Sequence, residues 1–242
     1  MRRSPPLPPH QISEAPHHIP HPPSVFGGWA ARRNPSCGCG KLRGVRNLRV
    51  GVLVSHNGSN LRALHRSSLE PGARFEIAVV IGNNSEAAGL AYARANRIPT
   101  RHLSGATHPD PDALDDAIRA ALVEHATEWV VTAGYMKKLG PRTRRQFDSR
   151  ILNIHPAPLP RFGGIGMFGL RVHEAVLASG VGVTGPTVHL VDGDYDTGRV
   201  IAQREVPVLA DDTAQTLAAR VLEAEHVVLP LVVRQIAAGR RP

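Results

Sequence analysis

Cysteine is almost absent from this chain of 242 residues, and the two cysteines that it has, Cys37 and Cys39, lie only two positions apart. A structural metal site normally takes about four ligands from two separated pairs, which this spacing does not supply. We interpret both side chains as exposed thiols in a reducing compartment and expect no bound metal.

Long apolar runs are also missing. No stretch approaches the roughly 18 to 20 apolar residues of a membrane span, and no charged segment near the start leads into the apolar region of a signal peptide. We therefore expect a cytoplasmic protein that does not associate with a membrane.

The glycine-containing loop at 55–60 lacks the motifs of common nucleotide-binding sites. Without G-x-G-x-x-G in that loop, and without G-x-x-x-x-G-K-[ST] anywhere in the sequence, we expect neither a nicotinamide dinucleotide nor ATP held by a P-loop. Without G-x-S-x-G, the sequence offers no nucleophile elbow for a hydrolase that uses Ser, His and Asp.

Acidic residues are scarce in the first 46 positions. This segment holds seven Arg or Lys and one acid, Glu14, so it carries +6 of the net charge of +9. It also holds 9 of the 21 prolines and lacks apolar periodicity, so burial cannot offset its ordering entropy. We predict a disordered Pro- and Arg-rich extension over 1–46 and a folded domain over 47–242. A targeting segment, a nucleic-acid tether, a dispensable extension and a misassigned start remain open interpretations. The +3 left for the folded domain gives no strongly basic surface, and we expect no nucleic-acid partner.

Apolar runs alternate with helical patterns from residue 48 to residue 132. Strands are predicted at 48–55, 75–82, 98–103 and 128–132, with helices from about 61, at 86–96 and at 110–125. Later patterns predict a helix at 170–178, an antiparallel hairpin of 184–190 and 200–206, and one long helix or a helix pair over 213–239. This order predicts an α/β fold with a Rossmann-like, mostly parallel sheet flanked by helices, followed by a carboxyl-terminal antiparallel hairpin and long helix.

Polar or glycine-rich stretches follow three of these strands, at 55–60, 133–137 and 153–164. Ligands bind outside the carboxyl ends of the strands in such sheets, so we expect the three stretches to share one site. His173, on the predicted helix at 170–178, is expected to face solvent or to cap that helix.

The first stretch contains Asn57, Gly58, Ser59 and Asn60 between a strand and a helix. Loop amides and a helix amino-terminus together suit an anion such as phosphate. Gly58 permits close backbone approach, while Ser59 and Asn60 either bind the anion or simply cap the helix. The residues alone leave both interpretations open.

The third stretch joins a short apolar strand to a Pro-rich loop. Pro lacks the N–H that a central strand needs, so the strand should end at His155, just before Pro156. Asn153 and His155 are two apart and should project to the same side of the strand. An amide donor beside a titratable imidazole suits acyl chemistry. We expect the prolines to turn the chain sharply away from the reacting group.

Three aspartates, Asp192, Asp194 and Asp196, fall within five residues. The run lacks the D-x-[DN]-x-[DN]-G pattern and the later Glu of an EF-hand, so calcium is not indicated. An Asp-rich turn is expected, with one acid available to a site.

Several pieces of the sequence resemble the folate-dependent formyltransferases. In chain order they are Ser-His-Asn-Gly-Ser-Asn at 55–60, Ala-Gly-Tyr-Met at 133–136, Asn-Ile-His-Pro at 153–156, Val-His-Leu-Val-Asp at 188–192, Asp-Thr-Gly at 196–198 and Ala-Glu-His at 224–226. The resemblance covers residues 48 to about 239. It implies the formyltransferase fold for a catalytic domain over 47–242. It also implies transfer of the formyl group of 10-formyltetrahydrofolate to the amine of glycinamide ribonucleotide, in purine biosynthesis and one-carbon metabolism.

The resemblance also implies roles for individual residues. It places catalysis on Asn153, His155 and Asp196, and substrate phosphate binding on Asn57, Gly58, Ser59 and Asn60. It places contacts with the amine or ribose of the ribonucleotide on Glu225 and Met136. It places folate binding on Lys137, Leu139, Asn153, Val191, Asp192 and Asp196. Lys137 departs from the Arg that relatives often carry, and it lacks the bidentate fork that Arg offers a carboxylate.

Other functions compete with this interpretation. A methionyl-tRNA formyltransferase would need an added carboxyl-terminal domain, and a formyltetrahydrofolate deformylase would need a folded regulatory domain in front; we expect neither. A non-catalytic nucleotide-binding module would explain residues 57–60 but not Asn153, His155 and Asp196 together. The deformylase and the binding module are kept as alternatives. The sequence leaves a monomer and a homodimer open.

Overall fold

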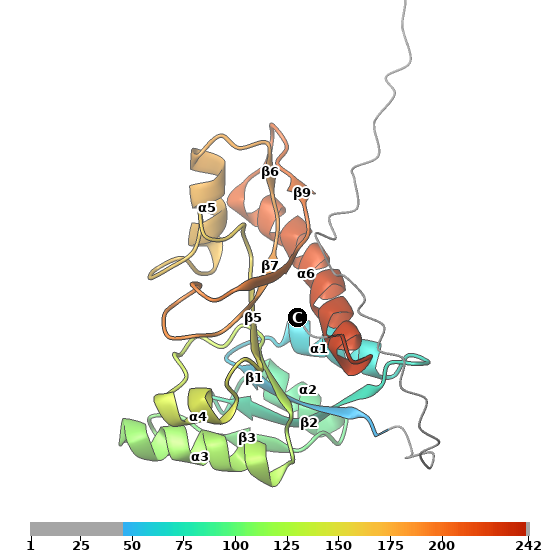
Figure 1. The fold of residues 1–242 in the computed structure, drawn as a ribbon. Coiled ribbons are helices and arrows are strands. Elements are labelled where there is room, and N and C mark those ends of the chain that lie inside the picture. The colour runs from blue at the N-terminus through green and yellow to red at the C-terminus, as the bar shows by residue number, and fades with distance from the viewer. Residues whose placement is uncertain (1–45, 241–242) are drawn as a thin grey trace, which may run out of the picture. The chain divides into compact units, whose positions relative to one another are not determined.

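The computed structural model describes residues 46–240. The centre of this fold is a seven-stranded sheet (Figure 1). Its strands lie in the order β3-β2-β1-β4-β5-β7-β8, and β6 and β9 form a separate two-stranded sheet. The strands are β1 Leu48–Val54, β2 Phe75–Gly82, β3 Thr100–His102, β4 Trp129–Thr132, β5 Ile151–His155, β6 Val183–Thr184, β7 Thr187–Leu190, β8 Val200–Gln203 and β9 Val206–Pro207. The predicted extension over 1–46, with Cys37 and Cys39, lies outside the described residues except for Arg46, so its boundary stays a prediction.

The large sheet is mixed, with a parallel part and an antiparallel edge. The neighbours from β3 through β5 pair in parallel, whereas β7 pairs antiparallel with β5 and β8 pairs antiparallel with β7. Parallel neighbours need long crossovers, and helices supply them between the first strands. The predicted α/β fold with a carboxyl-terminal antiparallel hairpin is confirmed.

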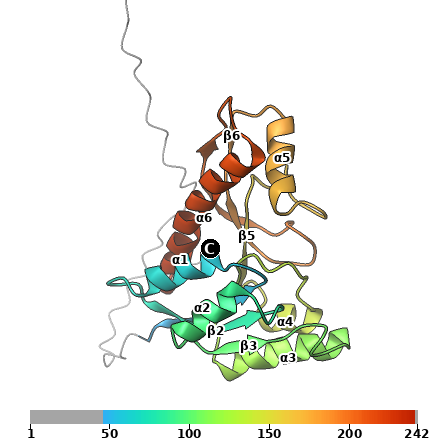
Figure 2. The ribbon, with the colours of Figure 1, turned by 180° about the vertical axis from the view of Figure 1, so that it is seen from behind.

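Helices cover both faces of this sheet (Figures 1 and 2). The helices are α1 Ser59–Ser68, α2 Ala88–Ala95, α3 Pro111–Glu124, α4 Pro141–Gln146, α5 Leu170–Ala178 and α6 Ala214–Ala237. Alternate side chains of a strand face opposite sides, and β1 shows the result. Val52 belongs to the apolar core under α1, α2 and α6, whereas Leu53 belongs to the core under α3.

The predicted hairpin of 184–190 and 200–206 is split between two sheets. β7 pairs with β8, but β6 pairs with β9. Between β6 and β7, Gly185 has φ +137°, and a Cβ there would lie 1.8 Å from the carbonyl oxygen of Arg204. Pro186 follows and has no N–H to donate to a ladder. The close backbone crossing and the missing donor interrupt the pairing.

The last helix, α6, is continuous through Pro230, so the prediction of one long helix holds and the helix pair is wrong. Pro230 removes the N–H that would bond to the carbonyl of His226. Leu229, Val232 and Val233 around it are buried in the core against the sheet, and this packing keeps the helix intact. Among residues 46–240, none of the helices combines the length and apolarity that crossing a membrane requires.

The helix α5 packs on the first half of α6 in a third apolar cluster. Val172 and Val176 of α5 lie in this cluster with Leu217 and Val221 of α6, and all four are fully buried. His173 is on the covered side of α5 and is 4% exposed. The expectation that His173 faces solvent or caps the helix is therefore wrong, because helix packing buries its ring.

The sequence patterns miss α4, which has one buried residue, Thr143. Its amino-terminus is capped by a side chain of another helix, α3. Asp115 of α3, 4% exposed, accepts hydrogen bonds from the backbone N–H of Arg142 at 2.7 Å and of Thr143 at 3.1 Å. A carboxylate at this end also interacts favourably with the positive end of the helix dipole. Tertiary capping, rather than periodicity, therefore defines α4.

Replacing Asp115 with Ala should lower the free energy of unfolding by about 2 kcal/mol, because two amides of α4 lose their acceptor. Urea unfolding followed by circular dichroism measures the change. Asp148→Ala removes an exposed carboxylate just beyond α4 and should cost less than about 0.5 kcal/mol. Equal losses in the two variants would contradict the capping role.

Candidate active site

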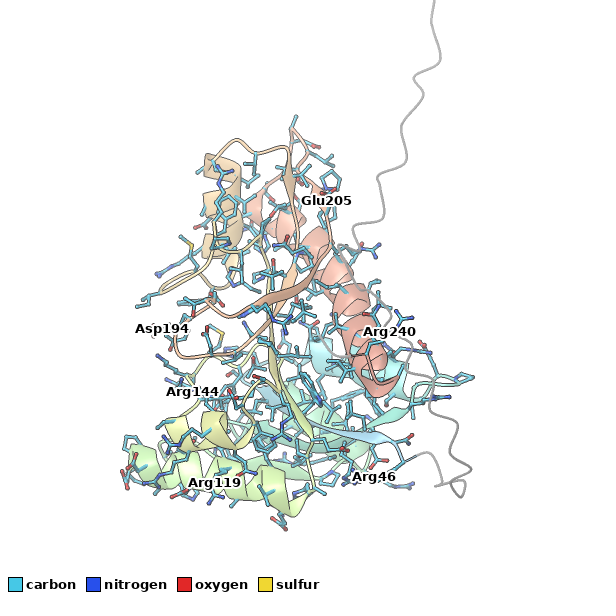
Figure 3. All side chains as sticks on the ribbon, in the orientation of Figure 1. Arg46, Arg119, Arg144, Asp194, Glu205 and Arg240 are labelled. Atoms are coloured by element: carbon cyan, nitrogen blue, oxygen red, sulfur yellow. The ribbon has the colours of Figure 1, made fainter. Side chains whose placement is uncertain are left out.

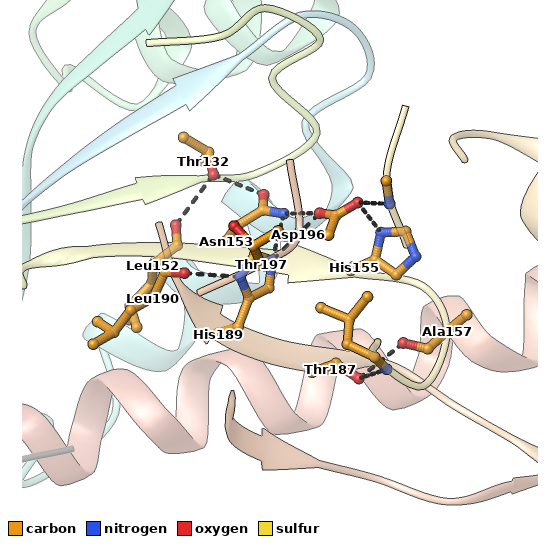
Figure 4. Close-up of polar contacts among 12 residues, drawn as sticks. Thr132, Leu152, Asn153, His155, Ala157, Thr187, His189, Leu190, Asp196 and Thr197 are labelled. Carbon is orange, nitrogen blue, oxygen red and sulfur yellow. Dashed lines mark hydrogen bonds and ion pairs between the residues drawn. The ribbon is translucent and has the colours of Figure 1, made fainter. Parts of the chain in front are cut away.

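The strand β5 ends at His155, as the following proline predicts. Asn153 and His155 lie two apart on this strand, and Figure 4 shows both reaching the same cluster of polar side chains. His189 of β7 lies directly opposite Asn153 across the antiparallel ladder. Its Nε2 is 3.0 Å from the Asn153 amide nitrogen. The strand pair thus brings an amide and two imidazoles together.

Asp196 joins the cluster from the loop between β7 and β8. Its Oδ1 lies 3.5 Å from Asn153 Nδ2, and its Oδ2 lies 3.4 Å from His155 Nδ1. The Asp196 backbone has φ +59°, in the left-handed region that non-glycine residues seldom adopt. The structure therefore brings the predicted trio together, with the acid held in a constrained backbone conformation.

The loop after β5 folds back over the trio instead of leaving it. The carbonyl oxygen of Phe162 accepts a hydrogen bond from His155 Nε2 at 2.7 Å, and the Gly164 N–H donates to Asp196 Oδ2 at 3.0 Å. A Cβ at Gly163 would lie 2.9 Å from the Cβ of Asp196, so glycine allows this close approach. The expectation that the prolines turn the chain sharply away is wrong for this cluster, because the loop returns to hydrogen-bond with both His155 and Asp196.

Burial and neighbouring groups shift the pKa values of both titratable members of the trio. Burial lowers the pKa of His155 below its ordinary value, although Asp196 and the Phe162 carbonyl act in the opposite direction. Burial alone would raise the pKa of Asp196. The contact with His189, the charge of His155 and the Gly164 N–H outweigh burial and lower it. At neutral pH the unliganded site therefore holds a carboxylate beside a neutral imidazole.

A pocket opens beside Asn153 and Asp196. All the residues predicted to bind folate line it, namely Lys137, Leu139, Asn153, Val191, Asp192 and Asp196. Arg144 and Asp194 also line it and lie on the same side of the molecule in Figure 3. Met136, 41% exposed, is not among the lining residues, and its predicted ribonucleotide contact stays a prediction.

The loop after β1 leads into α1 without a side-chain cap. Gly58 precedes the helix with φ +67°, and neither Ser59 nor Asn60 caps it, so the simple capping interpretation is wrong. Asn60 instead donates from Nδ2 to Glu225 Oε2 of α6 at 2.6 Å. The amides at the start of α1 are left without a side-chain acceptor, which keeps the anion-binding interpretation of residues 57–60 in place.

The three polar stretches meet at the carboxyl edge of the sheet, as the parallel topology predicts. The N–H of Ser55 donates to the carbonyl of Gly134, and the Ser55 hydroxyl accepts from the N–H of Met136 at 2.8 Å. Thr132 at the end of β4 donates from its hydroxyl to Asn153 Oδ1 at 2.7 Å. Hydrogen bonds therefore link the ends of β1, β4 and β5.

Sequence reasoning assigned no role to His189 or Thr132. Both are buried, and both hydrogen-bond to Asn153. His189 alternates with Thr187 along an apolar strand, which is a weak signal for an inward-facing polar group. Its partner depends on the register of β7 against β5, which no local pattern specifies. Within residues 46–240, no group of three or more His, Cys, Asp or Glu is arranged to hold a metal ion.

The sequence of this chain matches a known family over most of the described residues. A model described as Formyl transferase matches residues 48–233. The chloroplastic phosphoribosylglycinamide formyltransferase of Vigna unguiculata is 43% identical over 197 residues, which cover 81% of this chain and 63% of that protein. The trifunctional purine biosynthetic protein adenosine-3 of Bos taurus is 42% identical over 194 residues, which cover 80% of this chain and 19% of that protein. The chain thus spans less than two thirds of the length of these two relatives.

A solved structure shares the fold. The phosphoribosylglycinamide formyltransferase from Brucella melitensis superposes with a TM-score of 0.74 at 43% sequence identity. The match covers 80% of this chain and 97% of that chain. The common fold therefore extends over nearly the whole of the Brucella chain.

Glu225 makes the stability of the folded protein depend on pH. Burial raises its pKa from 4.5 to about 7, although the hydrogen bond from Asn60 acts in the opposite direction. The unfolded chain ionises this group at lower pH than the folded one does. Ionisation therefore weakens the fold as pH rises from about 4.5 to 7, and the effect is complete above pH 7. A shift of this size corresponds to about 3 kcal/mol.

Glu225→Gln, which keeps an oxygen for Asn60, should raise the free energy of unfolding at pH 8 by about 1 to 3 kcal/mol and change it little near pH 4. Urea unfolding at the two pH values measures the difference. Glu223→Gln on the exposed side of α6 is the matched control and should show no such pH dependence. A gain of equal size at both pH values would contradict the raised pKa.

Proposed function

The chain belongs to the formyl transferase family, and from this premise we propose that it transfers the formyl group of 10-formyltetrahydrofolate to the amine of glycinamide ribonucleotide, N1-(5-phospho-D-ribosyl)glycinamide. The observation that carries the proposal is the placement of the Asp196 carboxylate between Asn153 and His155, at 3.5 and 3.4 Å. The names of the Vigna and Brucella relatives support the choice of acceptor. The reaction places the protein in purine biosynthesis, and a cytoplasmic location is part of the same proposal.

The folate co-substrate enters the cavity beside Asn153 and Asp196. Leu139 and Val191 supply apolar walls for a planar ring system, while Lys137 and Asp192 supply polar groups at the lining. An apolar pocket with a few convergent polar groups is what orients a small organic ligand. With the ring system in the cavity, the formyl group it carries reaches the trio at the inner end.

The ribonucleotide approaches from the other side, over α1. Its phosphate binds the loop of Asn57, Gly58, Ser59 and Asn60 and the free amides at the start of the helix. Glu225, tied to Asn60 at 2.6 Å, lies where the ribose or glycinamide portion follows the phosphate. The substrate thus lies between the α1 amino-terminus and the trio, with its amine toward Asn153.

The chemical step is attack of the primary amine on the formyl carbon. A bond forms between the amine nitrogen and the formyl carbon, and the bond from that carbon to the folate nitrogen breaks. Negative charge develops on the formyl oxygen in between. Asn153 Nδ2 donates to that oxygen, and donors of this kind contribute on the order of 100- to 1,000-fold in rate. The step needs no covalent intermediate with the protein.

His155 stabilises the charge that develops during this step, and Asp196 helps to move the proton. Because His155 Nε2 donates to the Phe162 carbonyl, Nδ1 is the ring nitrogen that takes up a proton from solvent and hydrogen-bonds through it to the charged formyl oxygen. His155 keeps this proton when the intermediate collapses. Asp196, ionised at neutral pH, orders a water that carries the proton lost by the amine to the departing folate nitrogen. The proton lost by the amine is thus the one that the folate nitrogen gains.

The acceptor is tested by incubating the purified protein with 10-formyltetrahydrofolate, with and without glycinamide ribonucleotide. Release of tetrahydrofolate should require the amine, because in the proposed reaction only the amine of the ribonucleotide attacks the formyl carbon. Absorbance of the folate and mass spectrometry of the formylated ribonucleotide follow the two products. Release at the same rate without the amine would replace this proposal with the deformylase reaction.

Asp196→Asn and His155→Ala should each lower kcat by on the order of 100-fold or more, with ribonucleotide binding largely kept. Asn is suited to the left-handed backbone at this position, so Asp196→Asn removes the charge without adding backbone strain. Asp211→Asn, at an exposed carboxylate on the turn before α6, is the control and should keep normal turnover. Near-normal kcat in either site variant would show that its assigned role is wrong.

A further inference from the structure

The carboxamide of Asn153 is held at both ends. At one end, the Thr132 hydroxyl lies 2.7 Å from Asn153 Oδ1. At the other end, Asn153 Nδ2 lies 3.0 Å from His189 Nε2. The terminal torsion of an Asn side chain is soft, so without such contacts the amide samples many orientations. The two contacts therefore decide where its N–H groups point.

The Thr132 hydroxyl has one proton and two acceptors within reach. Asn153 Oδ1 is at 2.7 Å and the Leu152 carbonyl oxygen is at 3.2 Å, so the shorter contact takes the proton. Thr132 is 6% exposed, so its hydroxyl is largely shielded from solvent. Loss of this donor would leave the oxygen of a partly buried amide without this hydrogen bond.

The ring of His189 fixes which end of the amide faces it. His189 Nδ1 lies 2.8 Å from the carbonyl oxygen of Leu190, so Nδ1 carries a proton and donates it. In the neutral ring, Nε2 is then an acceptor and receives one N–H of Asn153. The second N–H of Asn153 remains directed toward Asp196 and the cavity.

The reversed amide is disfavoured by its neighbours. It would set the amide oxygen 3.5 Å from Asp196 Oδ1, bringing an oxygen dipole toward a carboxylate. It would also need a proton on His189 Nε2 in addition to the one on Nδ1. The observed orientation satisfies Thr132, His189 and Asp196 together (Figure 4).

We propose that Thr132 is a positioning residue of the active site, whose hydroxyl anchors Asn153 so that one amide N–H is presented to the formyl oxygen. The inference rests on the proposed formyl transfer. Thr132 acts through Asn153, because its hydroxyl proton is used on Asn153 Oδ1. Its effect therefore belongs to the transition state, where the donor to the oxyanion is needed, and not to substrate binding.

Thr132→Val replaces the hydroxyl with a methyl group of similar size. It should lower kcat by about 3- to 10-fold, the range expected for loss of one neutral hydrogen bond. The KM for both substrates should stay within about twofold. Thr132→Ser keeps the hydroxyl and should restore most of the wild-type kcat. Melting temperatures of all variants show that the fold is retained.

A double-variant cycle with Asn153→Ala separates a positioning role from other effects. In the Asn153→Ala background, Thr132→Val should cause no further loss of kcat, because the group it positions is gone. Thr127→Val, at a buried hydroxyl without a hydrogen-bond partner just before β4, is the matched control and should leave kcat unchanged.

Three results would contradict the positioning role of Thr132, and a fourth would contradict the proposed function itself. An unchanged kcat in Thr132→Val, or an equal loss in the Asn153→Ala background, would overturn the positioning role. A raised KM for 10-formyltetrahydrofolate with unchanged kcat would also overturn it, since Thr132 lines the cavity. A wild-type protein without amine-dependent transfer would overturn the proposed function and this inference together, which distinguishes that failure from the others.

Discussion

The carboxylate of Asp196 is the group on which the arrangement of the site depends. It comes from a loop 43 residues beyond Asn153, yet its two oxygens lie within 3.5 Å of Asn153, His155 and His189. Its side chain is 11% exposed, and a buried charge is tolerated only when donors surround it. The N–H of Gly164 is one such donor, so the returning loop and the carboxylate hold each other in place. The polar groups that we propose act in catalysis are thereby preorganised.

The sheet places this cluster next to the loop of residues 57–60, which we propose binds an anion. Ser55 follows β1, and its N–H and hydroxyl both bond to the loop that follows β4. Thr132, at the end of β4, bonds in turn to Asn153 on β5. A chain of short contacts therefore sets the distance between the start of α1 and the trio. Two substrates that meet in one site need that distance fixed, because small misplacements of reacting atoms reduce rates strongly.

Local sequence patterns predicted the parts of the site that lie on one element. Strand periodicity put Asn153 and His155 on one side, and Pro156 ended the strand, as observed. His189 could not be placed in the same way, because it meets Asn153 through the register of two strands that run antiparallel. The partner of Asn60 lies 165 residues away. What the sequence misses is therefore set by tertiary pairing, which has no local period.

The pKa values of two carboxyl groups shift in opposite directions, and the polar groups around each explain why. Asp196 lies beside the N–H of Gly164, the amide of Asn153 and two imidazoles, and its pKa falls. Glu225 is 8% exposed, and a single donor, from Asn60, reaches it, so burial dominates and its pKa rises to about 7. Glu225 accepts a hydrogen bond from Asn60, at the start of the helix whose amides we propose bind an anion. A charged carboxylate there would repel a phosphate, whereas a neutral carboxyl can donate to it or to a hydroxyl. The opposite shifts thus keep Asp196 ionised, where we propose that a proton moves, and leave Glu225 partly protonated near pH 7, beside the loop that we propose binds an anion.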